Sequence, residues 1–270
     1  MVIVHGSGTS DRSNAWTTAY ANGLVARGIA VLHPDKRGSG KSTGTWQTAD
    51  FLVLADDAVA GVEWLRGHPR AAAGNVGVIG FSQGGHVVPA AAARSEHVAF
   101  VIDVSGSTVP IHEQVSDEVT LMAERAGLSS DELAIVANVQ KLGMRYAHSG
   151  EGWDGYATAL AAAKSGRLGG MEVIEGFPTK PDAPAWRFAR LVGEFDPMDY
   201  WKQVKVPVVF VYGGRDTQVR VAKSVRRILD LLDPLELNYT LMVFGHNGHA
   251  LYREDQLDLL ARWIKSGGQT

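Results

Sequence analysis

Cysteine is absent from the 270 residues of this chain. Disulfide bonds, thiolate metal sites and a cysteine nucleophile are therefore excluded. The histidines give no metal-binding pattern either, because the nine of them show no paired spacing such as HExxH. We therefore expect neither a metal ion nor another cofactor.

Long apolar runs and clusters of basic residues are lacking as well. No apolar run approaches the roughly 20 residues that a membrane-spanning helix needs, and no charged segment followed by an apolar one marks a signal peptide. The formal net charge is −3 and the pI about 6.3, which argues against nucleic acid as a partner, since phosphate binding needs concentrated lysine and arginine. We expect a cytoplasmic protein, with export of a longer precursor as the alternative.

What the chain does contain is an alternation of strand-like and helix-like segments. Short apolar, often β-branched segments are expected to form strands at residues 1–4, 29–34, 75–79, 98–104, 206–212 and 239–244. Helical patterns separate these segments, which predicts an α/β fold with a mostly parallel sheet flanked by helices. Between the fourth and fifth of them the pattern is helical only, so we expect a core of residues 1–104 and 206–270 with a helical lid insertion at 105–205.

The most informative motif is Gly80-Phe81-Ser82-Gln83-Gly84. It lies between an expected strand and a helical stretch at residues 85–94, which is the context of the nucleophile elbow of serine hydrolases. The sharp turn strains the serine backbone and crowds its neighbours, and glycine at both flanking positions relieves that crowding. Ser82 is therefore the candidate nucleophile.

A serine hydroxyl needs a histidine to take its proton and a carboxylate to orient the histidine. Asp216 follows the expected strand at 206–212, in the chain order Ser, Asp, His that is typical of these enzymes. Asp103 is a rival within an earlier strand, and Asp216 could instead cap the next helix. We favour His249 as the base, with His246 in the same loop as the alternative.

The remaining part of such a site is an oxyanion hole built from backbone N–H groups. The segment His5-Gly6-Ser7-Gly8 follows the first expected strand. We assign the hole to the amides of Ser7 and Gln83, and we expect His5 to shape the loop rather than act as a base.

One further motif, Gly38-Ser39-Gly40-Lys41-Ser42, is similar to the end of a nucleotide-binding P-loop. That pattern requires a glycine five residues before Gly40, where this chain has Asp35. The segment that follows does not begin an apolar helix either, so nucleotide binding is not expected.

Taken together, four segments and the final histidine loop resemble α/β-hydrolase serine esterases, in particular bacterial EstD-type carboxylesterases, which are also described as serine aminopeptidase-like hydrolases. The segments are HGSGTSDR at 5–12, ARGIAVLHPDKRGSGKSTG at 26–44, VGVIGFSQGG at 76–85 and VPVVFVYGGRDTQV at 206–219. The resemblance implies a triad of Ser82, Asp216 and His249, with the insertion as a lid over an acyl pocket.

The chain departs from that pattern in two places. Its histidine loop is one residue longer and holds two histidines, and the first two strands of the family are absent before residue 1. We expect the sheet edge left uncovered there to pair with another copy, giving a homodimer, because unpaired strand edges invite association.

These observations predict a serine hydrolase that cleaves small carboxylic esters through an acyl-enzyme. The alternatives are a peptidase or amidase that uses the same triad, and a ligand-binding receptor on the α/β-hydrolase fold. Within the insertion, Trp153, Tyr156 and Trp186 are candidates for the substrate pocket, and packing inside the lid is the alternative role for them.

Overall fold

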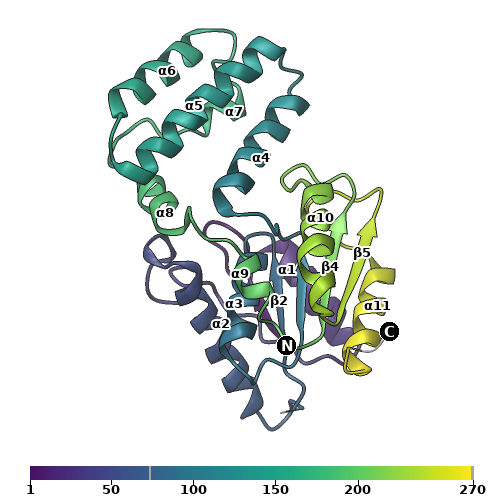
Figure 1. Cartoon of the computed structure of the whole chain (residues 1–270). Helices are drawn as coiled ribbons and strands as arrows, with labels where there is room; N and C mark the ends of the chain where they lie inside the picture. Colours follow the sequence, from purple (N-terminus) through teal and green to yellow (C-terminus); the bar gives the residue numbers. More distant parts are fainter. Residues whose placement is uncertain (73, 269–270) are drawn as a thin grey trace. The chain divides into compact units, whose positions relative to one another are not determined.

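A computed structural model describes residues 1–72 and 74–268 and divides the chain into two compact units (Figure 1). The first, called here the α/β unit, comprises Met1–Val109, Asp196–Asp216 and Val221–Thr270. The second, the helical unit, comprises Pro110–Phe195 and Thr217–Arg220. That the helical unit acts as a lid stays a prediction.

The α/β unit is built on a five-stranded, wholly parallel sheet with the strand order β1-β2-β3-β4-β5. The strands are β1 (Val2–Val4), β2 (Val78–Phe81), β3 (Val101–Val104), β4 (Val208–Gly213) and β5 (Tyr239–Phe244). The strand expected at residues 29–34 contributes a single parallel bridge, between Leu32 and Val2. Pro34 has no N–H to extend this pairing, and its carbonyl accepts a hydrogen bond from the His5 side chain instead.

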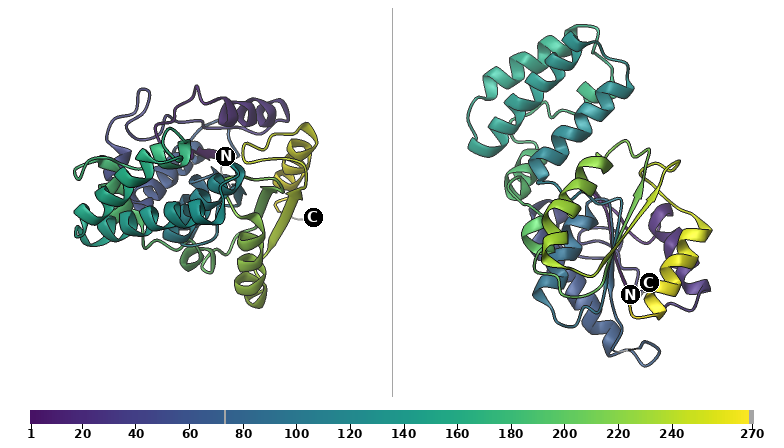
Figure 2. Two further views of the ribbon diagram at one scale, coloured as in Figure 1. Left: turned by 90° about the horizontal axis from the view of Figure 1, so that it is seen from above. Right: turned by 45° about the vertical axis from the view of Figure 1, so that its right-hand side comes forward.

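Helices cover both faces of this sheet. They are α1 (Ala15–Ala26), α2 (Phe51–Arg66), α3 (Gly84–Arg94), α9 (Met198–Trp201), α10 (Val221–Leu232) and α11 (Glu254–Lys265), with 3₁₀ turns η1 (Trp46–Thr48) and η2 (Asp233–Leu235). Successive strand residues face opposite sides, so Ile79 packs with α1 and α11 in one core, whereas Val78 packs with α2, α3, α9 and α10 in the other. The right-hand view of Figure 2 shows α1 and α11 together on one face of the sheet.

The helical unit has a core of its own. Its helices are α4 (Ile111–Arg125), α5 (Ser130–Ser149), α6 (Trp153–Ser165), α7 (Glu172–Glu175) and α8 (Pro184–Val192). The capping box expected before α5 is present, with the Ser129 and Glu132 side chains each bonded to the other residue's backbone N–H. Apolar residues from these helices, including Tyr156 and Trp186, form a separate hydrophobic cluster.

Within residues 1–72 and 74–268, no helix combines the length and the apolar character that crossing a membrane requires. Self-association through the edge of the sheet stays a prediction.

Candidate active site

Ser82 occupies a strained turn between β2 and α3. Its φ of 52° lies in the left-handed region, which non-glycine residues rarely adopt. A Cβ on Gly80 would come within 2.5 Å of the Gly84 carbonyl oxygen, and one on Gly84 within 2.5 Å of the Val4 carbonyl oxygen. Both flanking glycines are therefore needed for the turn to form, and the turn lifts Ser82 out of the sheet at its carboxyl end.

A chain of two hydrogen bonds joins Ser82 to His249 and Asp216. His249 Nε2 lies 2.9 Å from Ser82 Oγ, and His249 Nδ1 lies 2.8 Å from Asp216 Oδ2. An ionised carboxylate only accepts hydrogen bonds, so Nδ1–H donates to Asp216 and Nε2 is left to accept from the serine hydroxyl. The Asp216 side chain is fully buried and that of His249 is 9% exposed, which shields both bonds from water.

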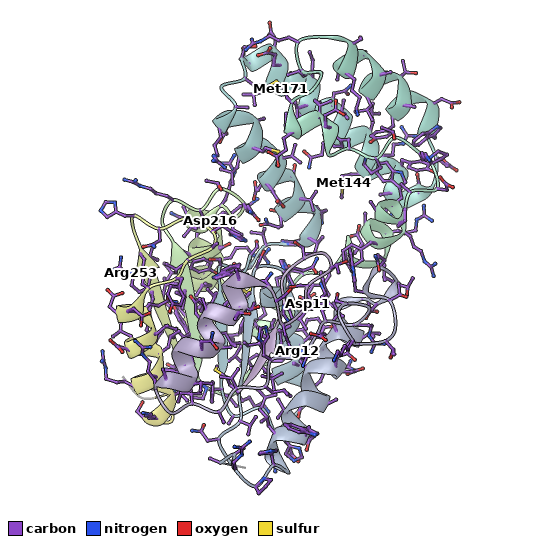
Figure 3. All side chains as sticks on the ribbon, turned by 180° about the vertical axis from the view of Figure 1, so that it is seen from behind. Asp11, Arg12, Met144, Met171, Asp216 and Arg253 are labelled. Atoms are coloured by element: carbon purple, nitrogen blue, oxygen red, sulfur yellow. The ribbon has the colours of Figure 1, made fainter. Side chains whose placement is uncertain are left out.

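The loops that carry Asp216 and His249 are bound to each other through the backbone. Arg215 N donates to Asn247 O at 2.8 Å, and Gly214 N donates to Phe244 O at 2.9 Å. A Cβ on Gly213 would lie 2.2 Å from the Gly248 carbonyl oxygen. The loops can approach this closely only because residue 213 is glycine, and this approach brings Asp216, labelled in Figure 3, to the histidine.

The two rivals named from the sequence lie elsewhere. His246 is exposed, and it is His249 that bonds to both Ser82 and Asp216. Asp103 is fully buried in β3, where its carboxyl packs against Gly85 and Gly106. Burial raises the pKa of Asp103 to about 8, against the opposing effect of the Gly106 N–H, so this side chain is mostly neutral at pH 7.

Two residues that hold the histidine loop were not found from the sequence. Ser105, with a φ of 55°, donates its hydroxyl proton to the His249 carbonyl oxygen at 2.8 Å. Trp16 donates from Nε1 to Leu251 O at 2.8 Å, and its ring lies 5.5 Å from the His249 ring. Ser105 directly follows β3 and Trp16 lies near the start of α1, so only the folded chain brings them together.

The segment assigned to the oxyanion hole lies directly against the nucleophile. A Cβ on Gly6 would lie 3.3 Å from Ser82 Cβ and 3.9 Å from Ser82 Oγ. Within the part of the chain that the structure describes, no protein acceptor takes the backbone N–H of Ser7 or of Gln83. Both donors are therefore available to a substrate oxygen.

His5 has the geometry of a structural residue. Its Nε2 lies 2.7 Å from Pro34 O, a carbonyl that can only accept, so Nε2–H is the donor. The Ser10 hydroxyl, 2.8 Å away, then donates to Nδ1. Burial lowers the pKa of His5, and both ring nitrogens are used in holding the loop.

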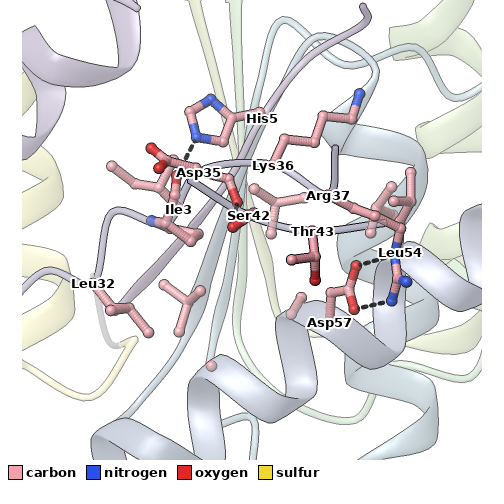
Figure 4. A pocket seen from close by; sticks show the side chains of 16 residues that line it. Ile3, His5, Leu32, Asp35, Lys36, Arg37, Ser42, Thr43, Leu54 and Asp57 are labelled. Carbon is pink, nitrogen blue, oxygen red and sulfur yellow. Dashed lines mark hydrogen bonds and ion pairs between the residues drawn. The ribbon is translucent and has the colours of Figure 1, made fainter. Parts of the chain in front are cut away.

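A cavity of about 340 Å³ lies beside β1 in the α/β unit (Figure 4). Apolar side chains such as Leu32 and Leu54 line it, together with the ion pair between Arg37 and Asp57. None of Ser82, Asp216 and His249 lines it, so it is distinct from the cluster that contains the candidate nucleophile.

The three pocket candidates of the insertion are packed inside the helical unit. Tyr156 is fully buried and Trp186 is 7% exposed. Both rings contact Trp153 and each other, and Trp186 also contacts Tyr146. Tyr156 Oη donates to Pro178 O and Trp186 Nε1 donates to Lys180 O, each at 2.8 Å. This arrangement favours core packing, and a pocket role for these residues stays a prediction.

Across the described ranges 1–72 and 74–268, no cluster of three or more histidine, aspartate or glutamate side chains is suited to hold a metal ion.

The parallel sheet with helices on both faces and the serine at its strand-to-helix turn define an α/β hydrolase, so the predicted fold class is confirmed. Residues 4–250 match the family model of the X-Pro dipeptidyl-peptidases (S15 family), and the chain belongs to this family.

The chain is also similar to esterases. It is 25% identical over 273 residues to esterase EstD of Thermotoga maritima, in a match that covers 99% of this chain and 58% of that protein. The chain thus spans less than two thirds of that relative's length.

Solved structures of esterases share the fold. The Pyrococcus furiosus esterase Pf2001 superposes with a TM-score of 0.62 at 20% identity, over 99% of this chain and 81% of that one. Est1E of Butyrivibrio proteoclasticus, solved with ferulic acid bound, gives 0.57 at 19% identity, over 98% and 86%. The predicted resemblance to α/β-hydrolase esterases is confirmed at this level of distant homology.

Proposed function

We propose that this protein is a serine hydrolase that cleaves carboxylic esters through an acyl-enzyme intermediate. The observation that carries the proposal is the hydrogen-bond chain from Ser82 Oγ through His249 to Asp216. Distant homology to esterases supports the ester as the bond that is cleaved.

In the first half of the reaction, Ser82 Oγ attacks the ester carbonyl carbon while His249 Nε2 accepts the hydroxyl proton. Asp216 holds the Nδ1–H tautomer and stabilises the imidazolium that forms. The amides of Ser7 and Gln83 donate to the carbonyl oxygen as it becomes negatively charged. Collapse of the tetrahedral intermediate breaks the bond to the alcohol oxygen, which takes the proton from His249.

In the second half, a water molecule replaces the alcohol. His249 Nε2 accepts a proton from this water as its oxygen attacks the acyl carbon, and the proton then returns to Ser82 Oγ as the acid leaves. Apart from the ester and this water, both halves of the reaction use only groups of this chain.

The test is hydrolysis of p-nitrophenyl esters of increasing acyl length by wild type and by Ser82→Ala. We expect fast turnover of short esters by wild type and a loss of about 10⁴-fold or more in the variant. Wild-type activity that survives in Ser82→Ala would refute the assignment. A slow single turnover with tight product binding would favour a receptor instead.

Membership of the S15 family favours a second candidate, cleavage of a peptide bond after proline by the same triad. Aminoacyl-prolyl p-nitroanilides assayed beside the esters separate the two functions. A higher kcat/KM on the anilides would replace the esterase with a dipeptidyl-peptidase, with the roles of the triad residues unchanged.

A further inference from the structure

The loop at residues 35–45, which the proposed mechanism does not use, packs against the segment that carries the oxyanion hole. Lys36 N donates to Ser10 O at 3.0 Å, and Ser10 N donates to Ser39 Oγ at 3.1 Å. Arg12 and Asp35 form an ion pair at 2.9 Å. The Gly/Ser-rich stretch that resembles a P-loop in sequence thus serves as the support of the neighbouring segment.

Lys36 makes the central contact of this support. Its Nζ lies 2.7 Å from Gly6 O, 3.2 Å from Gly8 O and 3.2 Å from Gln83 Oε1. An ammonium group has three N–H donors, and these three acceptors use all of them. Lys36 is only 8% exposed, and its Nζ lies 5.1 Å from the centroid of the Trp46 ring. Lys36 is one of the residues that line the cavity beside β1, and Figure 4 shows its side chain directed away from Asp57.

The positions of these acceptors relate Lys36 to both halves of the oxyanion hole. Gly6 and Gly8 flank Ser7, and Gln83 follows Ser82, so one ammonium group joins the two segments whose amides are the proposed donors. We propose that Lys36 is a positioning residue that fixes the Ser7 and Gln83 amides relative to each other and supplies positive charge behind the oxyanion. This inference rests on the proposed serine-hydrolase function.

Burial of this ammonium group is costly, which argues that its position matters. A buried lysine loses hydration that its hydrogen bonds only partly replace. Desolvation lowers the pKa of Lys36 to about 8, so the side chain is still mainly charged at pH 7 and loses its charge as the pH rises above 8. His5 is a titratable neighbour that interacts with this ammonium group, and desolvation favours the neutral form of His5. Asp35 and Arg37 are the charged residues on either side of Lys36 in the chain.

The experiment compares Lys36→Met, which keeps the length of the side chain but removes charge and donors, with Lys41→Met. Lys41 lies in the same loop with an exposed side chain, so this control has the same charge change. For Lys36→Met we expect kcat for a short p-nitrophenyl ester to fall about 100-fold with little change in KM, as for loss of an oxyanion donor. Lys41→Met should stay within about twofold of wild type.

Three additional readouts distinguish positioning from a role in folding alone. End-point titration with a fluorophosphonate counts the competent sites, so that kcat is expressed per folded molecule. A boronic acid, which mimics the anionic tetrahedral intermediate, should bind Lys36→Met more weakly by about the same factor as kcat falls. In addition, the decline of wild-type kcat above pH 8 should be absent in Lys36→Met.

Gln83→Met tests whether Lys36 acts through its hydrogen bond to the Gln83 side chain, because this variant removes that acceptor and keeps the backbone amide. Its effect on kcat should be smaller than that of Lys36→Met, and the double variant should lose less than the product of the two single losses. If Lys36→Met turns over like Lys41→Met per titrated site, the inference is overturned while the esterase proposal stands. If wild type neither turns over esters nor reacts with the fluorophosphonate, both are overturned.

Discussion

The α/β unit and the helical unit bury different kinds of side chain. The α/β unit encloses polar and ionisable groups near Ser82, including His5, Lys36, Asp103 and Ser105. In Pro110–Phe195 of the helical unit, the buried set is apolar apart from Gln140. The comparison indicates that every residue of the proposed reaction belongs to the α/β unit, whereas the helical unit builds an independent hydrophobic core.

The two units also differ in where their backbones are strained. Among the described residues of the α/β unit, Ser82, Ser105 and Glu236 have positive φ without being glycine, at 52°, 55° and 52°. In the helical unit, positive φ is found at glycines, such as Gly150 and Gly152 next to helix ends. Strain of this kind persists only where surrounding contacts enforce it, and here both strained serines bond to His249.

The largest expected effect comes from removing His249, the proposed general base in the α/β unit. His249→Ala should lower kcat/KM for a short ester by about 10⁴-fold, because the serine then has no proton acceptor. His246→Ala is the matched control in the same loop and should cost no more than about tenfold. The reverse order of the two effects would assign the base to His246.

Next in size is the response of stability to pH that Asp103 introduces. The pKa of Asp103 is about 8 in the folded chain against an ordinary value of 3.8, so between these values the folded state holds a proton that the unfolded state has lost. The contribution of Asp103 to the free energy of unfolding is fully present below pH 4. This contribution falls by up to about 1.4 kcal/mol per pH unit as the pH rises to 8.

Asp103→Asn should remove that dependence, because asparagine mimics the neutral acid in shape and hydrogen bonding. Urea unfolding at pH 5 and pH 8 measures the effect. We expect the gain of the variant over wild type to be larger at pH 8. An equal difference at both values would mean that Asp103 is ionised in the folded protein.

Replacing Trp186 tests whether the hydrophobic core of the helical unit stabilises that unit. Trp186→Ala should destabilise that unit by about 3–5 kcal/mol through loss of buried contacts, as measured by calorimetry. Leu191→Ala changes an exposed residue of the same helix and should cost less than about 0.5 kcal/mol. A shift in acyl-chain preference, with stability unchanged, would instead make Trp186 a pocket residue.

The smallest expected effect concerns the anchor of the histidine loop. Ser105→Ala removes the hydroxyl that holds the His249 carbonyl oxygen, and we expect kcat to fall about tenfold, equivalent to about 1.4 kcal/mol. Ser107→Ala, in the same segment, removes a hydroxyl that accepts from Val109 N and should leave kcat within about twofold. Equal losses in both variants would mean that any change in this segment disturbs the site.

A feature of the site could be predicted from the sequence when the residues that cause it lie close together in the chain. The turn at Ser82 could be recognised because its glycine motif lies within five consecutive residues, and one of the two close approaches, that of Gly80 to the Gly84 carbonyl oxygen, is local. The choice between His249 and His246 depends on how one loop packs against Gly213 and Gly214, far away in the chain. Lys36 was overlooked for the same reason, since its partners lie 28 to 47 residues away.

The aromatic residues of the insertion show a different limit. The large aromatic side chains of Tyr156 and Trp186 indicate that they bury apolar surface, but a protein core and an acyl pocket are equally apolar. Only the packing of several helices identifies the core, through ring contacts between α5, α6 and α8.

The most direct test of the central claim is covalent labelling of the nucleophile. Wild type is incubated with a fluorophosphonate, digested, and the labelled peptide identified by mass spectrometry, with Ser82→Ala and His249→Ala treated in parallel. We expect a single phosphonyl group on Ser82 in wild type, none in Ser82→Ala, and labelling slowed by orders of magnitude in His249→Ala. Label on another residue, or equally fast labelling without His249, would contradict the assignment of Ser82 as nucleophile and His249 as base.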